Sequence, residues 1–427
     1  MSAPVAGDGP SRPGPSRRRL LTGLGVAGAA LAGAGATAGL TAATSPAAGT
    51  VLGRARSATV AFEGAHQAGI TTPVQAHLHL AALDVTTDRR EDLADLLARW
   101  SEAARALTSG RDVGEGGAVD GDPLAPPADT GEAHDLTAAR LTLTVGVGPS
   151  LFDDRFGLAG RRPAALTDLP AFAGDALEPA RCGGDLVVQA CAEDPQVAVH
   201  AVRTLVRLAA GTAAVRWAQL GFGKASSTDP SEPTPRNLFG FKDGTANPDA
   251  RDEALMAEHV WVAGGDDPAG DWLVGGSYLV ARRVEMHVET WDRAPLAEQE
   301  AVVGRTKGEG APLGGTGEHD VLDAAALARL PADSHVSLSH PSRFGGAQML
   351  RRGYSFVDGA DGLGHLSAGL VFLAYQRDPR TAFTPVQEAL SRADAMGEYL
   401  RHTGSGVWAV LPGVTGAGDW WGRSLLG

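Results

Sequence analysis

The stretch Gly240-Phe241-Lys242-Asp243-Gly244-Thr245-Ala246-Asn247-Pro248 holds one carboxylate between two glycines, next to Thr, Asn and Pro. Gly240 and Gly244 permit backbone angles and close approaches that a Cβ would forbid, and Asn-Pro is typical of a segment end. The pattern therefore predicts a tight loop that holds Asp243 where a flat, bulky ligand can lie against the backbone. On local pattern alone, a plain turn whose Asp bonds its own backbone is favoured.

A second region changes that interpretation. It contains Asp333-Ser334-His335-Val336, and Arg351-Arg352-Gly353-Tyr354 follows. Together with the Asp243 loop, these segments resemble the dye-decolorising (DyP-type) haem peroxidase family, in particular its exported, deferrochelatase/peroxidase-like members. In that family haem lies between a proximal His and a distal Asp-Arg pair. The resemblance covers the chain from about Val60 to Leu411, with acidic loop insertions.

Three further segments carry the resemblance. The residues 62–70 with Thr72-Pro73 resemble the opening strand of the family, and Gly184-Asp185-Leu186 with Cys191-Ala192 resembles its mid-domain strand. Leu370-Val371-Phe372 resembles the strand that covers the distal haem face.

Apolar periodicity divides the chain into strands and helices. Strands are predicted at 77–85, 141–147, 185–190, 215–222, 277–288, 349–357, 369–376 and 407–411, and helices near 93–100, 194–208, 295–305 and 384–396. Antiparallel strands with helices on one face predict an α+β sandwich. The resemblance selects two ferredoxin-like domains with antiparallel sheets, of the dimeric α+β barrel-like superfamily, at 58–225 and 236–427, with haem in the second. The Gly-, Pro- and Asp-rich residues 110–135 predict an exposed loop or a disordered insertion.

Composition limits the partners. The 427 residues are 43% hydrophobic, so a sizeable core is possible, and the net charge is −13. Residues 1–48 contribute +3, from four Arg and one Asp, which leaves −16 on the remainder. Such a body repels nucleic acid and anionic membranes, and no nucleic-acid partner is expected.

The N-terminal region predicts export. Ser16-Arg17-Arg18-Arg19-Leu20-Leu21 opens a run of Ala, Gly, Leu and Thr that reaches Ala43. A twin-arginine pair before a weakly apolar stretch is typical of a Tat signal, so residues 1–48 are expected to engage the Tat translocase. The expected location is periplasmic, extracellular or membrane-associated. A transmembrane helix is the alternative, although the many Gly and Ala would make a poor one.

Two residue pairs have plainer interpretations. Cys182 and Cys191 are separated by a predicted strand, too far apart for a disulfide, and are expected to be two buried free thiols. His77 and His79 share one strand face, but two such histidines without a third ligand are more often ordinary surface or core residues than a metal site.

On the proximal side, the resemblance implies that His335 is the haem ligand and hence the metal-binding residue. His340 is the rival histidine, and Asp394 is the candidate anionic partner of the ligand imidazole. No Cys-x-x-Cys-His motif is present, so the expected cofactor is haem b, bound noncovalently, one per chain.

On the distal side, the resemblance implies that Asp243 transfers the peroxide proton and that Arg351 stabilises developing negative charge and contacts the cofactor. The alternative for Arg351 is a strand-edge salt bridge, and Arg352 is expected at a haem propionate or in solvent. The other expected cofactor contacts are Gly244, Thr245, Leu370 and Phe372. The last two could equally be plain core, and Thr245 and Asn247 are expected to fix the loop.

The expected function is haem-dependent reduction of hydrogen peroxide with oxidation of bulky, dye-like or other one-electron donors. Two alternatives use the same fold: an iron-handling, deferrochelatase-like role in an iron-uptake system, and a haem carrier without turnover. A general α+β binding protein without haem is a further alternative. The reductant and the oligomeric state stay open, with a homo-oligomer among the options.

Overall fold

The computed structural model describes residues 58–226 and 233–427, so the predicted signal at 1–48 lies outside the described residues. The strands are β1 (His77–Val85), β2 (Thr142–Val147), β3 (Leu186–Ala192), β4 (Ala213–Lys224), β5 (Ser277–Met286), β6 (Leu350–Arg351), β7 (Tyr354–Ala360), β8 (Leu366–Gln376) and β9 (Leu400–Val410). The helices are α2 (Arg90–Thr108), α3 (Pro195–Leu208), α4 (Glu253–His259), α5 (Val288–Trp291), α6 (Leu296–Val303), α7 (Ala324–Leu327), α8 (His335–Ser339), α9 (Phe383–Ala393) and α10 (Arg423–Leu426).

The strands form one antiparallel sheet that closes on itself. Their order is β5-β9-β2-β3-β1-β4-β7-β8-β6, and an additional β5–β8 pairing joins the second half of the sheet back to its start. Each half of the chain has the ferredoxin-like order, β4-β1-β3-β2 in the first and β9-β5-β8-β7 in the second. The predicted α+β class with antiparallel, barrel-like sheets is confirmed.

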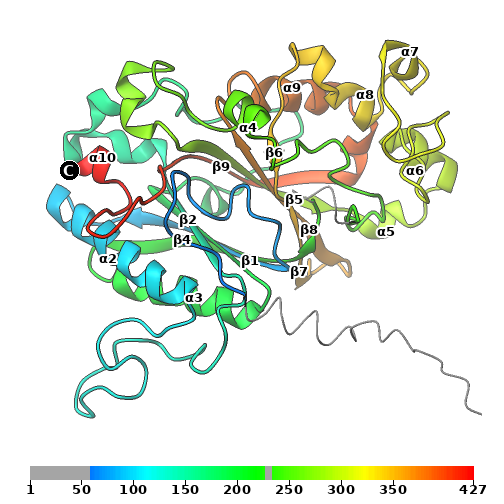
Figure 1. Cartoon of the computed structure of the whole chain (residues 1–427). Coiled ribbons are helices and arrows are strands. Elements are labelled where there is room, and N and C mark those ends of the chain that lie inside the picture. The colour runs from blue at the N-terminus through cyan, green and yellow to red at the C-terminus, as the bar shows by residue number, and fades with distance from the viewer. Residues whose placement is uncertain (1–57, 227–232) are drawn as a thin grey trace, which may run out of the picture. The chain divides into compact units, whose positions relative to one another are not determined.

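In the first half, two helices cover the outer face of the strands (Figure 1). The apolar positions of α2 repeat at helical spacing, and Leu93, Leu97 and Trp100 are fully buried. The indole of Trp100 donates to Leu205 O on α3 (2.8 Å), which ties the two helices together. Burying one such side chain contributes about 1.5–3 kcal/mol to the free energy of folding. The buried face of α2 therefore stabilises the first half of the chain strongly.

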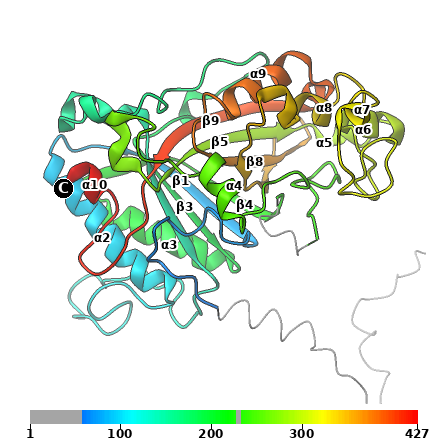
Figure 2. The same cartoon turned by 45° about the horizontal axis from the view of Figure 1, so that its top comes forward.

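In the second half, short helices and loops cover the equivalent face. Residues 287–353 connect β5 to β7 through α5, α6, α7 and α8, and α9 follows β8 (Figure 2). Within β8, Val371 and Leu373 face the barrel interior, while Leu370 and Phe372 face outward under these helices. This outward face carries the candidate site.

The predicted opening strand at 62–73 is wrong, because this segment has no strand structure. The side chain of Gln67 bonds the backbone of Val145 and Leu411, and Gly69 has a left-handed φ of 93°. Side-chain hydrogen bonds and a glycine bend therefore place this segment, rather than a ladder of backbone bonds.

Two predicted strands have different bounds. The single strand expected at 349–357 is divided into β6 and β7 at Arg352-Gly353, although Arg352 N still donates to Leu373 O (2.8 Å). The last strand, expected at 407–411, begins at Leu400, because it pairs with β5 along its whole length.

The insertion at 110–135 is not disordered. The carboxylate of Asp129 is fully buried and accepts hydrogen bonds from Val113 N (2.8 Å), Gly131 N (2.7 Å) and the His200 side chain (2.7 Å). One carboxylate thus attaches the insertion to α3, a contact that composition does not reveal.

The cysteines are free, as predicted, but only Cys191 is buried. Cys182 is half-exposed and donates to Glu178 O (3.2 Å). Among residues 58–226 and 233–427, no helix has both the length and the apolar character that a membrane crossing requires.

Candidate active site

A cavity of about 580 Å³ lies on the outer face of β5, β8 and β9. Its apolar walls include Val284, Met286, Leu370 and Phe372 from the strands, and Leu390 from α9. The predicted positions of Leu370 and Phe372 on one strand face are thus confirmed, and both side chains border the cavity rather than filling a closed core. The volume suits a large, flat, mainly apolar ligand.

On one side of the cavity, His335 meets Asp394. The imidazole Nδ1 lies 2.7 Å from Asp394 Oδ2, so Nε2 is the ring nitrogen left for a ligand in the cavity. Burial alone lowers the pKa of His335, but the charge and hydrogen bond of Asp394 more than offset it, and the pKa is raised. The predicted contact between these two residues is present.

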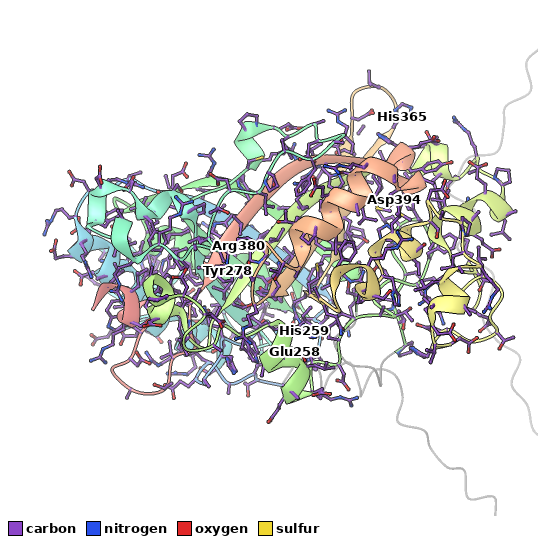
Figure 3. All side chains as sticks on the ribbon, turned by 90° about the horizontal axis from the view of Figure 1, so that it is seen from above. Glu258, His259, Tyr278, His365, Arg380 and Asp394 are labelled. Atoms are coloured by element: carbon purple, nitrogen blue, oxygen red, sulfur yellow. The ribbon has the colours of Figure 1, made fainter. Side chains whose placement is uncertain are left out.

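The local fold brings the two residues together. His335 is the first residue of α8. Asp394, which Figure 3 labels, follows the end of α9. Ala395 N donates to Asp333 O (3.0 Å), which joins the segment after α9 to the segment before α8. Met396 N bonds Asp394 Oδ1 (2.9 Å), so the carboxylate presents Oδ2 to the imidazole.

His340 also borders the cavity, but its contacts differ. Its Nδ1 accepts from Ser342 N (3.3 Å) and lies 2.9 Å from Ser342 Oγ, which caps the 3₁₀ helix Pro341–Phe344. Burial, with a smaller effect from Arg343, lowers the pKa of His340. The structure therefore gives His340 a local capping role and gives the carboxylate partner to His335.

A second pair, Asp243 and Arg351, also borders the cavity. Arg351 Nη1 donates to Asp243 Oδ1 (2.9 Å), and Asn237 Nδ2 makes a longer bond to Oδ2 (3.3 Å). Both members of the pair border the cavity and are only partly exposed. The predicted distal pair is thus assembled from residues 108 positions apart.

The side chain of Asn247 places Arg351. Its Oδ1 accepts from Arg351 N (2.8 Å) and its Nδ2 donates to Arg351 O (3.0 Å), as a neighbouring strand would do. Gly244, which also borders the cavity, has a left-handed φ of 100°, and this conformation lets the loop turn between Asp243 and Asn247. The expected loop-fixing role of Asn247 is present in this geometry.

Arg352 lies elsewhere. The prediction of a propionate or solvent contact is wrong, because Arg352 is fully buried inside the barrel and donates to Thr72 O and to the side chain of Gln75. Adjacent residues point to opposite faces of a strand, so placing Arg351 at the cavity sends Arg352 inward.

Several polar cavity residues were not predicted from the sequence: Arg282, Arg305 and His402. Burial lowers the pKa of Arg305, and burial with the nearby Arg282 lowers the pKa of His402 to about 4. The one available signal was the Arg282-Arg283 doublet inside an apolar strand, since cations rarely occur there without a partner.

A metal ion can also be bound directly by side chains, without a cofactor. In the described ranges, no three or more His, Cys, Asp or Glu residues are grouped to hold a metal ion. His79, one of the strand pair considered above, is mostly buried, and burial lowers its pKa to about 4.

Comparisons with known proteins place the chain in a family. The model for "Dyp-type peroxidase, N-terminal" matches residues 67–223, and that for "Dyp-type peroxidase, C-terminal" matches residues 234–415. Deferrochelatase of Escherichia coli (strain UTI89 / UPEC) is 41% identical over 420 residues, covering 96% of this chain and 97% of the relative.

Two solved structures are similar over most of the chain. A DyP-type peroxidase from Streptomyces coelicolor is 39% identical with a TM-score of 0.78, covering 87% of this chain and 98% of that one. An oxyferrous/water mixed complex of DtpA from Streptomyces lividans is 38% identical with a TM-score of 0.77, covering 87% and 99%.

Proposed function

The chain belongs to the Dyp-type peroxidase family of haem peroxidases, and on this premise we propose that it binds one haem b noncovalently and reduces hydrogen peroxide with it. The electrons come from bulky or other one-electron donors. The observation that carries this proposal is that one cavity is bordered by both a His–Asp pair and an Asp–Arg pair.

The residues around the cavity fit haem. The apolar walls suit the macrocycle, His335 has one free ring nitrogen, and the guanidinium of Arg305 is a cation that suits propionate groups. Bound there, haem would supply an iron centre for cleavage of the peroxide bond and for one-electron oxidation of the donor.

The proximal pair prepares the ligand. The carboxylate of Asp394 accepts a hydrogen bond from Nδ1–H of His335, which fixes the tautomer with Nε2 toward the cavity. An anionic partner also makes the imidazole a stronger electron donor. Asp394 is therefore the residue that orients and tunes the ligand.

The distal pair divides its work. Asp243 Oδ1 is occupied by Arg351, whereas among the residues that the structure describes Oδ2 has only the longer contact from Asn237. Oδ2 is therefore the oxygen that takes a proton from the inner peroxide oxygen and delivers it to the outer one. The guanidinium of Arg351 stabilises the negative charge that develops as the O–O bond breaks.

The first test concerns the ligand. His335→Ala should yield protein with little or no Soret absorbance, because the axial bond is lost. The matched control is His340→Ala, which should load haem as the unchanged chain does. The reverse pattern would move the ligand to His340, and a colourless unchanged protein would favour a binding protein without haem.

A second candidate function is an iron-handling role with haem or ferrous iron as substrate, favoured by the similarity to proteins named deferrochelatase. Loaded protein that releases iron under reducing conditions but shows no peroxide-dependent spectral change would support it. The Asp243–Arg351 pair favours turnover over simple haem carriage, since a carrier needs no proton-transferring pair.

Export through the Tat translocase is part of the proposal. It is supported by the sequence Arg17-Arg18 before an Ala- and Gly-rich run. Replacing both residues by Lys should retain the protein in the cytoplasm, because a receptor reads the arginine pair and not its charge alone. Export of the Lys variant at the normal level would contradict this.

A further inference from the structure

Residues 304–322, here called the strap, follow α6 and border the cavity through Arg305 and Leu322. The strap lies against the distal loop, defined as residues 235–248, which carries Asp243. Of the strap residues, only Arg305 is assigned to the cofactor, so the contacts of Glu318, Lys307 and Gly310 with the distal loop need their own explanation.

Glu318 is the centre of these contacts. Its Oε2 accepts from Lys242 Nζ (2.5 Å) and its Oε1 accepts from Thr245 Oγ1 (3.0 Å). The two donors flank Asp243, one on each side. The Glu318 side chain is only 12% exposed, so solvent screens the ion pair with Lys242 incompletely.

Two arginine side chains donate hydrogen bonds to backbone oxygens of the strap and the distal loop. Arg305 Nη1 donates to Glu318 O (2.8 Å) and to Gly310 O (2.6 Å), which ties the strap to itself at the cavity wall. Arg236 donates to Gly240 O (2.8 Å) in the distal loop and to Lys307 O (2.6 Å) in the strap.

The two segments also interlock by shape. A Cβ on Gly240 of the distal loop would lie 2.9 Å from Lys307 Cε of the strap, and a Cβ on Gly310 of the strap would lie 2.8 Å from Lys242 Cδ. Each segment thus uses a glycine, with a positive φ, where a lysine of the other segment packs. This reciprocal packing is independent of the Glu318 hydrogen bonds.

We propose that Glu318 is a positioning residue for peroxide reduction: it clamps the distal loop on both sides of Asp243 and so holds the carboxylate in line with Arg351. Its effect on catalysis rests on the proposed function, but the clamp itself does not. A loop released on one side would leave Asp243 mobile, and small misplacements of a catalytic group are costly.

Hydrogen exchange tests the clamp without using activity. Peptides covering 235–248 should exchange about tenfold faster in Glu318→Ala, because charge-assisted bonds are lost. Glu318→Gln keeps an acceptor oxygen and should restore part of the protection. The control is Glu309→Gln, an exposed position on the same strap, which should exchange like the unchanged protein.

Each result of the exchange experiment either supports the clamp or overturns it. Unchanged exchange at 235–248 in Glu318→Ala would overturn the proposal. If Glu318→Ala instead raises exchange throughout the protein, Thr245→Val decides, because it removes only one of the bonds: faster exchange confined to 235–248 supports the clamp, and no change refutes it.

Peroxide kinetics then test the consequence. In haem-loaded Glu318→Ala, kcat/KM for peroxide should fall about tenfold with the Soret position and the haem content unchanged, and Glu318→Gln should recover part of it. Normal kcat/KM with a loosened loop would refute the positioning role. If the unchanged protein has no peroxidase activity, the proposed function fails, while the exchange result still decides whether the clamp exists.

Discussion

The two halves of the molecule share one strand order but differ in what covers the outer face of the sheet. Between β1 and β2 the chain forms the long helix α2, whose buried Leu93, Leu97 and Trp100 fill the space over the strands. Between β5 and β7 it forms short helices and the strap, and a cavity of about 580 Å³ stays over β5, β8 and β9.

This difference shows how the same strand order can carry a filled core in one half and a cavity in the other. A continuous amphipathic helix converts the sheet face into core, because its apolar side chains interdigitate with the strands. A connection broken into short helices cannot fill the same face, and each break places a helix end or loop at the rim. His335 at the start of α8 is one such position, and its partner Asp394 comes from the end of α9, which follows β8.

The largest expected effect lies in the cavity half. Asp243→Ala should slow the peroxide-dependent change of the Soret band by about 10²–10⁴-fold, because a positioned proton-transferring group is lost. It should also flatten the pH dependence of that rate, whereas Arg351→Leu should slow the step and keep an acid limb. Stopped-flow mixing with peroxide across pH measures both. An Asp243→Ala protein with normal rate and pH dependence would leave Arg351 as the main distal catalyst.

A matched pair of core truncations compares the packing of the two outer sheet faces directly. Leu97→Ala in α2 should lower the free energy of unfolding by about 2–5 kcal/mol, because it opens a void in a filled core. Leu370→Ala on the cavity wall should cost only about 1 kcal/mol, since that side chain already borders open space. Denaturant unfolding of the cofactor-free protein gives both values. Equal costs would mean that the two faces are packed alike.

The proximal partner should have a smaller effect. Asp394→Ala should weaken haem binding by about 10–100-fold, the usual consequence of removing a hydrogen-bonding partner of a metal ligand. Haem titration followed at the Soret band measures the affinity, and Glu388→Ala on the exposed part of α9 is the control. Undiminished affinity would show that His335 needs no carboxylate to hold its orientation.

The smallest effect is expected at the 110–135 insertion of the first half. Burial raises the pKa of Asp129, but hydrogen bonds from Gly131, Val113 and His200 lower it more, so its pKa lies below the usual 3.8. A carboxylate whose pKa is lowered by folding stabilises the folded state at pH values above 3.8, its usual pKa. This stabilisation is lost as the pH falls through the folded-state pKa.

Protease cleavage within 110–135 should therefore increase as the pH falls below about 3.8, because protonation of Asp129 weakens the hydrogen bonds that hold the insertion. Asp129→Asn should remove this pH dependence. An acid-tolerant protease and mass spectrometry locate the cuts, and a pH-independent cleavage pattern in the unchanged protein would contradict the expectation.

Several of these features were accessible from the sequence. Period-two and helical apolar patterns placed β1 at residues 77–85 and the buried positions of α2, because burial of one face imposes that period wherever it occurs. The motif residues Asp243, His335 and Arg351, and the partner Asp394, were likewise found by resemblance, and the structure brings all four to one cavity.

Other features were not accessible, for a common reason. Arg352 was misplaced because the side of the strand that faces the cavity is set by pairing with β8 and not by local composition. The resemblance predicted a strand at 62–73, and the sequence does not reveal the true conformation, because the side-chain bonds of Gln67 to Val145 and Leu411 join residues far apart in the chain.

From the sequence alone follow the α+β class, the order of most elements and the motif residues that the structure brings to one cavity, since these depend on periodicity and on short motifs. Only the tertiary structure decided which face stays open and what holds the distal loop there. Glu318, Lys242 and Thr245 meet across more than 70 residues, and a contact at that range leaves no local pattern. The physical reason is that folding joins such groups by closing the barrel and docking the strap, both of which are properties of the whole chain.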